Sequence, residues 1–164
     1  MKIIKPTICK DKSLAEAHEH AKAINEPVFV PMSVFADDRG WSHMNLMKGV
    51  LGPEGQINIS EVYPGTIKAW HRHKFQTDFW MCPKGHIKVG VFRDDFTAWQ
   101  IVVGEKNPGI VIIPPTLWHG VSTVGPQSAL MIYYVTHSYN VQNPDEERRA
   151  FDSVEGFHWG VEHK

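Results

Sequence analysis

Three histidines and one aspartate, spread over three segments of the chain, are the residue types of a metal site or of a proton-transfer site. His71 and His73 are one residue apart, so on a strand both side chains point to the same face. Asp78 follows the polar stretch KFQT, which predicts a hairpin turn, and His119 follows the proline-rich turn in IIPPTLWHG. We therefore expect these four side chains to converge inside one barrel.

Two kinds of chemistry suit this set. Three neutral imidazoles and one carboxylate suit a divalent transition metal (Fe, Mn, Ni, Co or Zn) and leave coordination positions open for a substrate. The same residues also suit a pocket of hydrogen-bonded histidines without a metal, so the expected cofactor is none or one such ion. The two roles exclude each other at His71, because a metal-bound nitrogen has no lone pair left to abstract a proton.

The elements that must position these residues are mostly strands. From Val28 onward, short β-branched and aromatic runs alternate with Gly, Pro and Asp. Strands are predicted at 28–34, 40–47, 56–63, 66–73, 78–82, 86–92, 99–103, 109–113 and 129–137. The fold class is therefore all-β, a sandwich or barrel.

One helix is predicted outside this barrel. Ser13 and Glu16 fit a capping box, and the amphipathic segment that they begin is stopped by Asn25 and Pro27. A second, short helical turn is expected after Pro144. The expected organisation is an extension over 1–27 that holds the helix, a barrel over 28–152 and a tail over 153–164.

Composition excludes several classes of protein. The chain has 164 residues, 42% hydrophobic and 21% charged, which is the profile of one folded domain. Its net charge of −1 does not suit a nucleic-acid surface. Cys9 and Cys82 form no disulfide framework, and we see neither a signal peptide nor the roughly 18 apolar residues of a membrane span. A cytoplasmic protein that contacts neither nucleic acid nor membrane is expected.

The histidine region resembles a known motif. The spacing G-x5-H-x-H-x4-D-x6-G over residues 65–85 is similar to the first motif of the cupins, with Asp78 in place of the usual Glu. Gly109, Pro114 and His119 match the second cupin motif in part. This resemblance implies a double-stranded β-helix, or jelly-roll barrel, and a metal tetrad of His71, His73, Asp78 and His119.

A second resemblance runs collinearly from about Val28 to Asp152. The segments VFADDRGW (34–41), QINIS (56–60), KAWH (68–71), IIPPTLWHG (112–120) and the stretch 131–152 resemble motifs of the dTDP-4-dehydrorhamnose 3,5-epimerase family, the RmlC-like cupins. The order and the spacing of the segments both match. The resemblance implies a homodimer, because subunits of that family exchange N-terminal strands.

This second resemblance also implies roles for single residues. His71 matches the catalytic base and Tyr133 the general acid. Substrate-binding positions are implied at Arg39, Asn58, Lys68 and His119, and Trp118 is expected at the pocket because it adjoins His119. Arg39 and Lys68 match the cations that hold the nucleotide diphosphate and polarise the substrate. Such residues suit proton transfer beside a keto group, because that group acidifies the neighbouring carbon-bound protons and imidazole titrates near neutral pH.

The chain differs from the family at two points. The family pairs its base with an Asp from a longer C-terminal region, which we expect this chain to lack. Asp78 stands where the family carries a substrate-facing Lys, and this reverses the charge in a site that binds an anion.

Three functions are compatible with these features. The leading hypothesis is an isomerase or epimerase that acts on a nucleotide-activated 4-keto-deoxysugar, or a related keto sugar, by His/Tyr acid–base chemistry. The alternative is a metal-dependent cupin enzyme (dioxygenase, lyase or sugar isomerase) with a site of three His and one Asp. The third is a cupin that binds a carbohydrate or a small metabolite without turnover.

Overall fold

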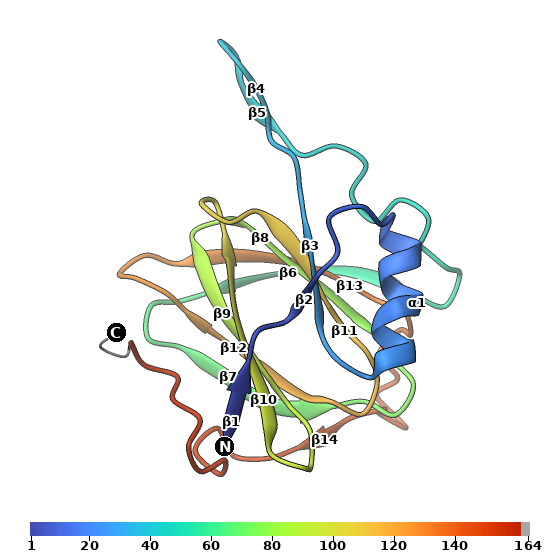
Figure 1. Cartoon of the computed structure of the whole chain (residues 1–164), viewed down its shortest axis with the longest axis vertical. Helices are drawn as coiled ribbons and strands as arrows, with labels where there is room; N and C mark the ends of the chain where they lie inside the picture. The colour runs from blue at the N-terminus through green and yellow to red at the C-terminus, as the bar shows by residue number, and fades with distance from the viewer. Residues whose placement is uncertain (162–164) are drawn as a thin grey trace.

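The computed structural model describes residues 1–161 and contains two six-stranded β-sheets with one helix packed outside them (Figure 1). The strands of the first sheet are, in order, β1 (Lys2–Ile4), β10 (Thr97–Gly104), β9 (His86–Phe92), β12 (Trp118–Thr123), β7 (Ile67–Arg72) and β14 (Glu147–Arg148). Those of the second sheet are β2 (Thr7–Ile8), β3 (Val28–Pro31), β11 (Gly109–Ile113), β8 (Asp78–Lys84), β13 (Ala129–Val135) and β6 (Gln56–Val62).

The main core lies between the two sheets. Along β9, Ile87, Val89 and Val91 alternate inward and are fully buried. They meet side chains of the opposite sheet such as Trp80 and Val111 in one apolar cluster. The predicted all-β jelly-roll with an N-terminal helix is thus confirmed, with 86–92 and 109–113 at the expected bounds.

Helix α1 (Leu14–Ile24) begins and ends as its sequence predicts. The Ser13 hydroxyl accepts the Glu16 N–H, and the Glu16 carboxylate accepts the Ser13 N–H at 2.8 Å, which completes the capping box. Asn25 ends the helix in the left-handed conformation, with φ 49°. Ala17 and Ala21 pack the helix against β3 and β11.

The hairpin of β4 (Phe35–Asp37) and β5 (Gly40–Ser42) projects away from the rest of the molecule (Figure 1). All of its residues are exposed. The strand predicted over 40–47 therefore ends much earlier than expected, at Ser42, and among the described residues no further strand pairs with the hairpin.

Two predictions on the C-terminal half are corrected. The segment after Pro144 forms no helical turn but the short strand β14, because main-chain hydrogen bonds join Trp70 and Arg149 in both directions at 3.0 Å. Arg72 also binds the Glu147 carboxylate at 2.9 Å and ties the segment to β7. Strand β12, which is absent from the strands predicted from the sequence, pairs with both β7 and β9.

In the part of the chain that the structure describes, the N-terminal strands pair with the sheets and the C-terminal segment packs on them. Strands β1 and β2, from the extension expected over 1–27, pair in parallel with β10 and β3. Within the tail expected over 153–164, Val154 and Phe157 pack on Trp70, and residues 162–164 lie outside the described residues. Within residues 1–161, no helix is long and apolar enough to cross a membrane.

Candidate functional site

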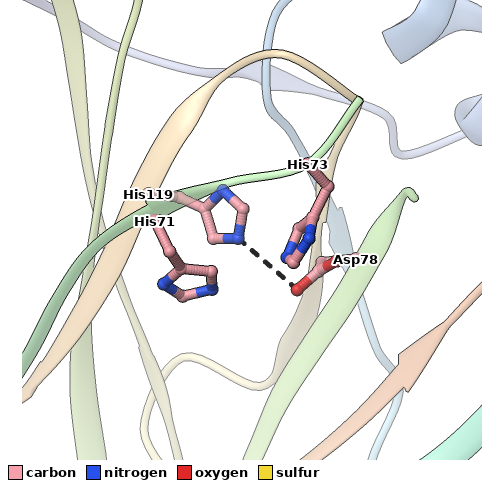
Figure 2. A group of neighbouring side chains, drawn as sticks. All are labelled: His71, His73, Asp78 and His119. Atoms are coloured by element: carbon pink, nitrogen blue, oxygen red, sulfur yellow. Dashed lines mark ion pairs between the residues drawn. The ribbon is translucent and has the colours of Figure 1, made fainter. Parts of the chain in front are cut away.

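The structure brings four side chains together between the sheets, as Figure 2 shows. His71 lies on β7, directly opposite His119 on β12, while His73 follows the end of β7 and Asp78 begins β8. One ligand atom from each residue lies within 4.8 Å of the others. Gly120 allows β12 to lie close to β7, because a Cβ at this position would collide with Ala69 on β7.

Carbonyl oxygens determine where two of the imidazoles carry their protons. Nδ1 of His119 lies 2.8 Å from the Leu117 carbonyl oxygen, and Nδ1 of His73 contacts the Asp145 carbonyl oxygen. A carbonyl only accepts, so each Nδ1 is the protonated nitrogen. In the neutral rings, the lone pairs are therefore on the two Nε2 atoms, and these atoms face the cluster.

The pair of His119 and Asp78 is electrostatically incomplete. Nε2 of His119 is buried, has no hydrogen-bond partner within the described residues and lies 3.5 Å from Oδ2 of Asp78 (Figure 2). A nitrogen lone pair facing a carboxylate oxygen is repulsive. Either a proton on Nε2 or a cation held by both groups removes this repulsion.

Asp78 is held ionised in a buried position. Gln76 Nε2 donates to one carboxylate oxygen at 2.6 Å and Trp80 Nε1 to the other at 2.9 Å. Burial alone would raise the pKa of Asp78, but His119, when its Nε2 carries a proton and donates to the carboxylate, and positive charge on the neighbouring imidazoles lower that pKa below its ordinary value. A fixed negative charge therefore lies at the base of the site.

His71, unlike Asp78, is held in its uncharged form. Burial lowers the pKa of His71 from 6.5 to about 2, and the nearby His119 contributes to the shift. The His71 ring is thus neutral at physiological pH and keeps a nitrogen lone pair. In the described residues, no carboxylate hydrogen-bonds to this ring, so the His–Asp pairing of the family is not reproduced here.

These groups open onto a cavity of about 290 Å³. Its polar lining consists of Gln56, Asn58, Ser60, Lys68, His71, His73, Gln76, Asp78, Tyr133, Tyr139, Glu146 and Arg148. Burial, together with the charge of Asp78, raises the pKa of Tyr133, so its hydroxyl stays protonated and able to donate. The cavity therefore combines neutral bases, an acid and cations.

The other residues implied by the resemblance divide into two groups. Asn58 and Lys68 line the cavity, and the Lys68 ammonium donates to Ser60 Oγ at 2.8 Å. Arg39 lies on the projecting hairpin, bound to Asp37 at 2.5 Å, and is not part of the cavity lining. Trp118 is buried beside the site, with the guanidinium groups of Arg72 and Arg149 over its ring.

Sequence reasoning missed the contribution of the C-terminal segment. Glu146 and Arg148 line the cavity and form an ion pair at 2.9 Å. Their spacing of two residues places both on one face of an extended segment. The expectation of a helical turn after Pro144 concealed this signal.

The tetrad fits a divalent transition metal. His73 and His119 each direct an Nε2 lone pair inward, and the unpartnered Nε2 of His119 is the orphaned atom that an ion would satisfy. The backbone carbonyls behind these rings are the outer partners that metal-binding histidines commonly have. His71, His73, Asp78 and His119 would hold the ion.

Known proteins resemble this chain in sequence. No family model matches. The chain is 41% identical over 100 residues to the probable low-salt glycan biosynthesis epimerase Agl13 of Haloferax volcanii, which covers 57% of this chain and 64% of that protein. It is 37% identical over 137 residues to the spore coat polysaccharide biosynthesis protein SpsL of Bacillus subtilis, which covers 77% of this chain and 90% of that protein.

Solved structures show the same fold. A dTDP sugar isomerase from Desulfovibrio desulfuricans superposes with a TM-score of 0.73 at 24% identity, over 83% of this chain and 92% of that one. The dTDP-4-dehydrorhamnose 3,5-epimerase of Bacillus anthracis, with TDP and PPi bound, gives 0.68 at 21% identity, over 84% and 86%. Both agree with the jelly-roll expected from the sequence.

The low pKa of His71 predicts that acid destabilises the metal-free fold. Below pH 6.5 the unfolded chain binds a proton at His71 that the folded chain does not bind, so stability falls as the pH drops. From pH 7.5 to 5.5 this residue contributes a loss of about 1 kcal/mol. Urea unfolding of chelator-treated protein measures it. His71→Asn should remove this decrease in the free energy of unfolding between pH 7.5 and 5.5. His158→Asn, at an exposed position, should leave the decrease unchanged.

Proposed function

Because the chain belongs to the RmlC-like cupins, the family of the dTDP-4-dehydrorhamnose 3,5-epimerases, we propose that it is an epimerase of a nucleotide-linked 4-keto-deoxysugar. The observation that carries this proposal is the cavity that His71, Tyr133 and the carboxylate of Asp78 line together. The relatives named above include an epimerase and a sugar isomerase, which favours this function over a dioxygenase or a lyase.

Proton transfer in this cavity follows from the charges around it. Neutral His71 accepts the proton from the carbon beside the keto group, and the resulting imidazolium is stabilised by the Asp78 carboxylate. Tyr133 returns a proton from its own hydroxyl, whose raised pKa keeps it protonated until the enolate forms. The Lys68 ammonium offsets the negative charge of the enolate.

Arg148 is the cation that we propose for the substrate diphosphate. Its side chain is 77% exposed at the cavity, and its charge contributes to the lowered pKa of His71. Glu146 holds the guanidinium at the rim and leaves most of its donors free. Within one subunit, Arg148 thus supplies the positive charge for the diphosphate, because Arg39 lies on the distant hairpin.

A homodimer accounts for the exposed hairpin. A two-stranded hairpin is marginally stable alone in water, and here Phe35 and Trp41 are 60% and 53% exposed. Strand β6 ends its sheet with an open edge and exposes Ile57 and Ile59. We propose that the hairpin of a second copy covers this edge and brings its Arg39 to the partner's cavity.

The tetrad supports a second candidate, an epimerase that holds one divalent transition metal. It rests on the unpartnered Nε2 of His119, whose lone pair faces the Asp78 carboxylate. When bound, such an ion would act as a Lewis acid on the carbonyl oxygen of the substrate. His71 would then serve as a ligand, so the Glu146 carboxylate, which also lines the cavity, would accept the proton from the carbon beside the carbonyl, and Tyr133 would remain the proton donor.

We also propose a cytoplasmic location. The thiols of Cys9 and Cys82 are free and buried, which suits a reducing compartment.

Deuterium exchange tests the epimerase proposal. The wild-type protein, incubated in D2O with a dTDP- or UDP-linked 4-keto-6-deoxyhexose, should incorporate deuterium at C3 or C5, as followed by NMR. His71→Asn should reduce exchange by about 10²–10⁴-fold, because the base is lost. Tyr133→Phe should retain exchange but lose inversion, and Tyr63→Phe, at an exposed position, should change neither. A wild-type protein without exchange on these substrates contradicts the proposal.

Binding of a nucleoside diphosphate tests the role of Arg148. Calorimetry with dTDP and UDP should show a Kd about tenfold higher for Arg148→Gln, since a charged hydrogen bond to phosphate contributes roughly 1.5 kcal/mol. Arg149→Gln is the matched control, because that guanidinium lies over Trp118 instead of in the cavity. Equal affinities of the two variants would remove Arg148 from the site.

Light scattering tests the dimer. Phe35→Asp should convert a dimer into a monomer, because it places a charge in the apolar hairpin contact. Phe96→Asp provides the control, since Phe96 is 59% exposed at the turn between β9 and β10. A monomeric wild-type protein, or a Phe35→Asp variant that stays dimeric, argues against hairpin exchange.

Elemental analysis of untagged protein tests the second candidate. About one divalent transition metal per chain is expected, and Asp78→Asn should lose it because the carboxylate ligand is removed. His158→Asn should keep the metal, since that exposed histidine lies outside the tetrad. Metal-free protein whose deuterium exchange is unaffected by a chelator would eliminate this candidate.

A further inference from the structure

Asp145 joins the C-terminal segment to the loop between β7 and β8 through both its side chain and its main chain. The carboxylate accepts three consecutive backbone N–H groups, from Lys74 at 2.8 Å, Phe75 at 3.0 Å and Gln76 at 3.3 Å. The main-chain carbonyl oxygen of Asp145 contacts Nδ1 of His73. One residue therefore holds both the loop and the imidazole at its start.

The contact with His73 determines which ring nitrogen is available to the cavity. As long as Nδ1 donates to the Asp145 carbonyl, the proton stays on Nδ1 and the Nε2 lone pair faces the tetrad. An imidazole released from this contact is free to carry its proton on Nε2. In that tautomer the ring presents an N–H to the site and can neither bind a metal nor accept a proton there.

The side chain of Asp145 is what keeps its carbonyl in position. The residue has no regular partner strand of its own, because β14 begins two residues later at Glu147. Three backbone N–H groups that donate to its carboxylate take the place of strand pairing. Charged hydrogen bonds of this kind are about twice as strong as neutral ones. The same loop carries Gln76, which donates to Asp78, so the anchor also reaches the carboxylate of the tetrad.

We propose that Asp145 is a positioning residue, which sets the tautomer of His73 from outside the cavity by clamping the loop that carries it. The inference deepens the proposed function, since it concerns the same site. The metal-holding candidate needs an Nε2 lone pair on His73, and in the acid–base candidate the tautomer of His73 decides whether this ring presents a lone pair or an N–H to the cavity.

The tautomer can be measured without substrate. In chelator-treated protein labelled with ¹⁵N-histidine, long-range ¹H–¹⁵N spectra distinguish protonated from unprotonated ring nitrogens, and His73→Asn assigns the signals. The wild-type protein should show His73 with its proton on Nδ1 alone. Asp145→Ala should lose this single state and show Nε2–H as well, whereas Asp145→Asn, which keeps one acceptor oxygen, should fall between the two.

Asp95→Asn is the matched control, because Asp95 also accepts a backbone N–H, from Thr97, at a turn away from the tetrad. It should leave the His73 signals unchanged. A wild-type His73 protonated on Nε2, or an unaltered tautomer in folded Asp145→Ala or Asp145→Asn, overturns the inference. Deuterium exchange by the wild-type protein tests the proposed function separately. Failure of the proposed function is therefore distinguishable from failure of the inference on Asp145.

Discussion

A buried carboxylate among three imidazoles is the interaction on which the rest of the site depends. Asp78 keeps its charge inside the protein because Gln76 and Trp80 donate to it and the neighbouring rings lower its pKa. Desolvating a carboxylate is costly, so this arrangement persists only with such compensation. The carboxylate in turn gives any positive charge that forms beside it, on an imidazole or on a bound ion, a favourable position.

His71 is buried beside Asp78, and this burial weakens His71 as a base. Its pKa of about 2 lies far below the near-neutral value that general-base catalysis favours, and within the described residues it lacks the hydrogen-bonded carboxylate that its family uses. A substrate that displaces water and brings its own charge changes the electrostatic environment that sets the pKa of His71. A metal that uses the ring as a ligand also changes it. The two candidate chemistries are thus two ways of completing one electrostatic arrangement.

The C-terminal segment completes the cavity from the other side. It contributes Glu146 and Arg148 to the lining, and Asp145 secures the loop behind His73. Its remaining contacts, Arg72 with Glu147 and Arg149 over Trp118, hold it against the first sheet. The charge of the cavity and the position of the His73 ring therefore depend on this segment as well as on the barrel strands.

Much of the fold and part of the site could be read from the sequence. β-Branched and aromatic runs bounded by Gly, Pro and Asp identified strands such as 86–92 and 109–113, and the capping residues identified the helix, because these signals are local. The spacing of His71 and His73 required one shared face. Their meeting with Asp78 and His119 was expected from the turns that precede these two residues, and the resemblance to the cupins supported it, since the sequence alone does not say which strands pair.

Tertiary structure alone decided the remainder. Strand β14 forms because β7 offers an open edge, and no local preference around Pro144 encodes that edge. For the same reason the sequence did not predict that Glu146 and Arg148 line the cavity, or that Arg39 lies on a hairpin with no partner strand among the described residues. Burial and hydrogen-bond partners set the tautomers and the pKa values of the site, and these depend on distances between residues that lie far apart in the sequence.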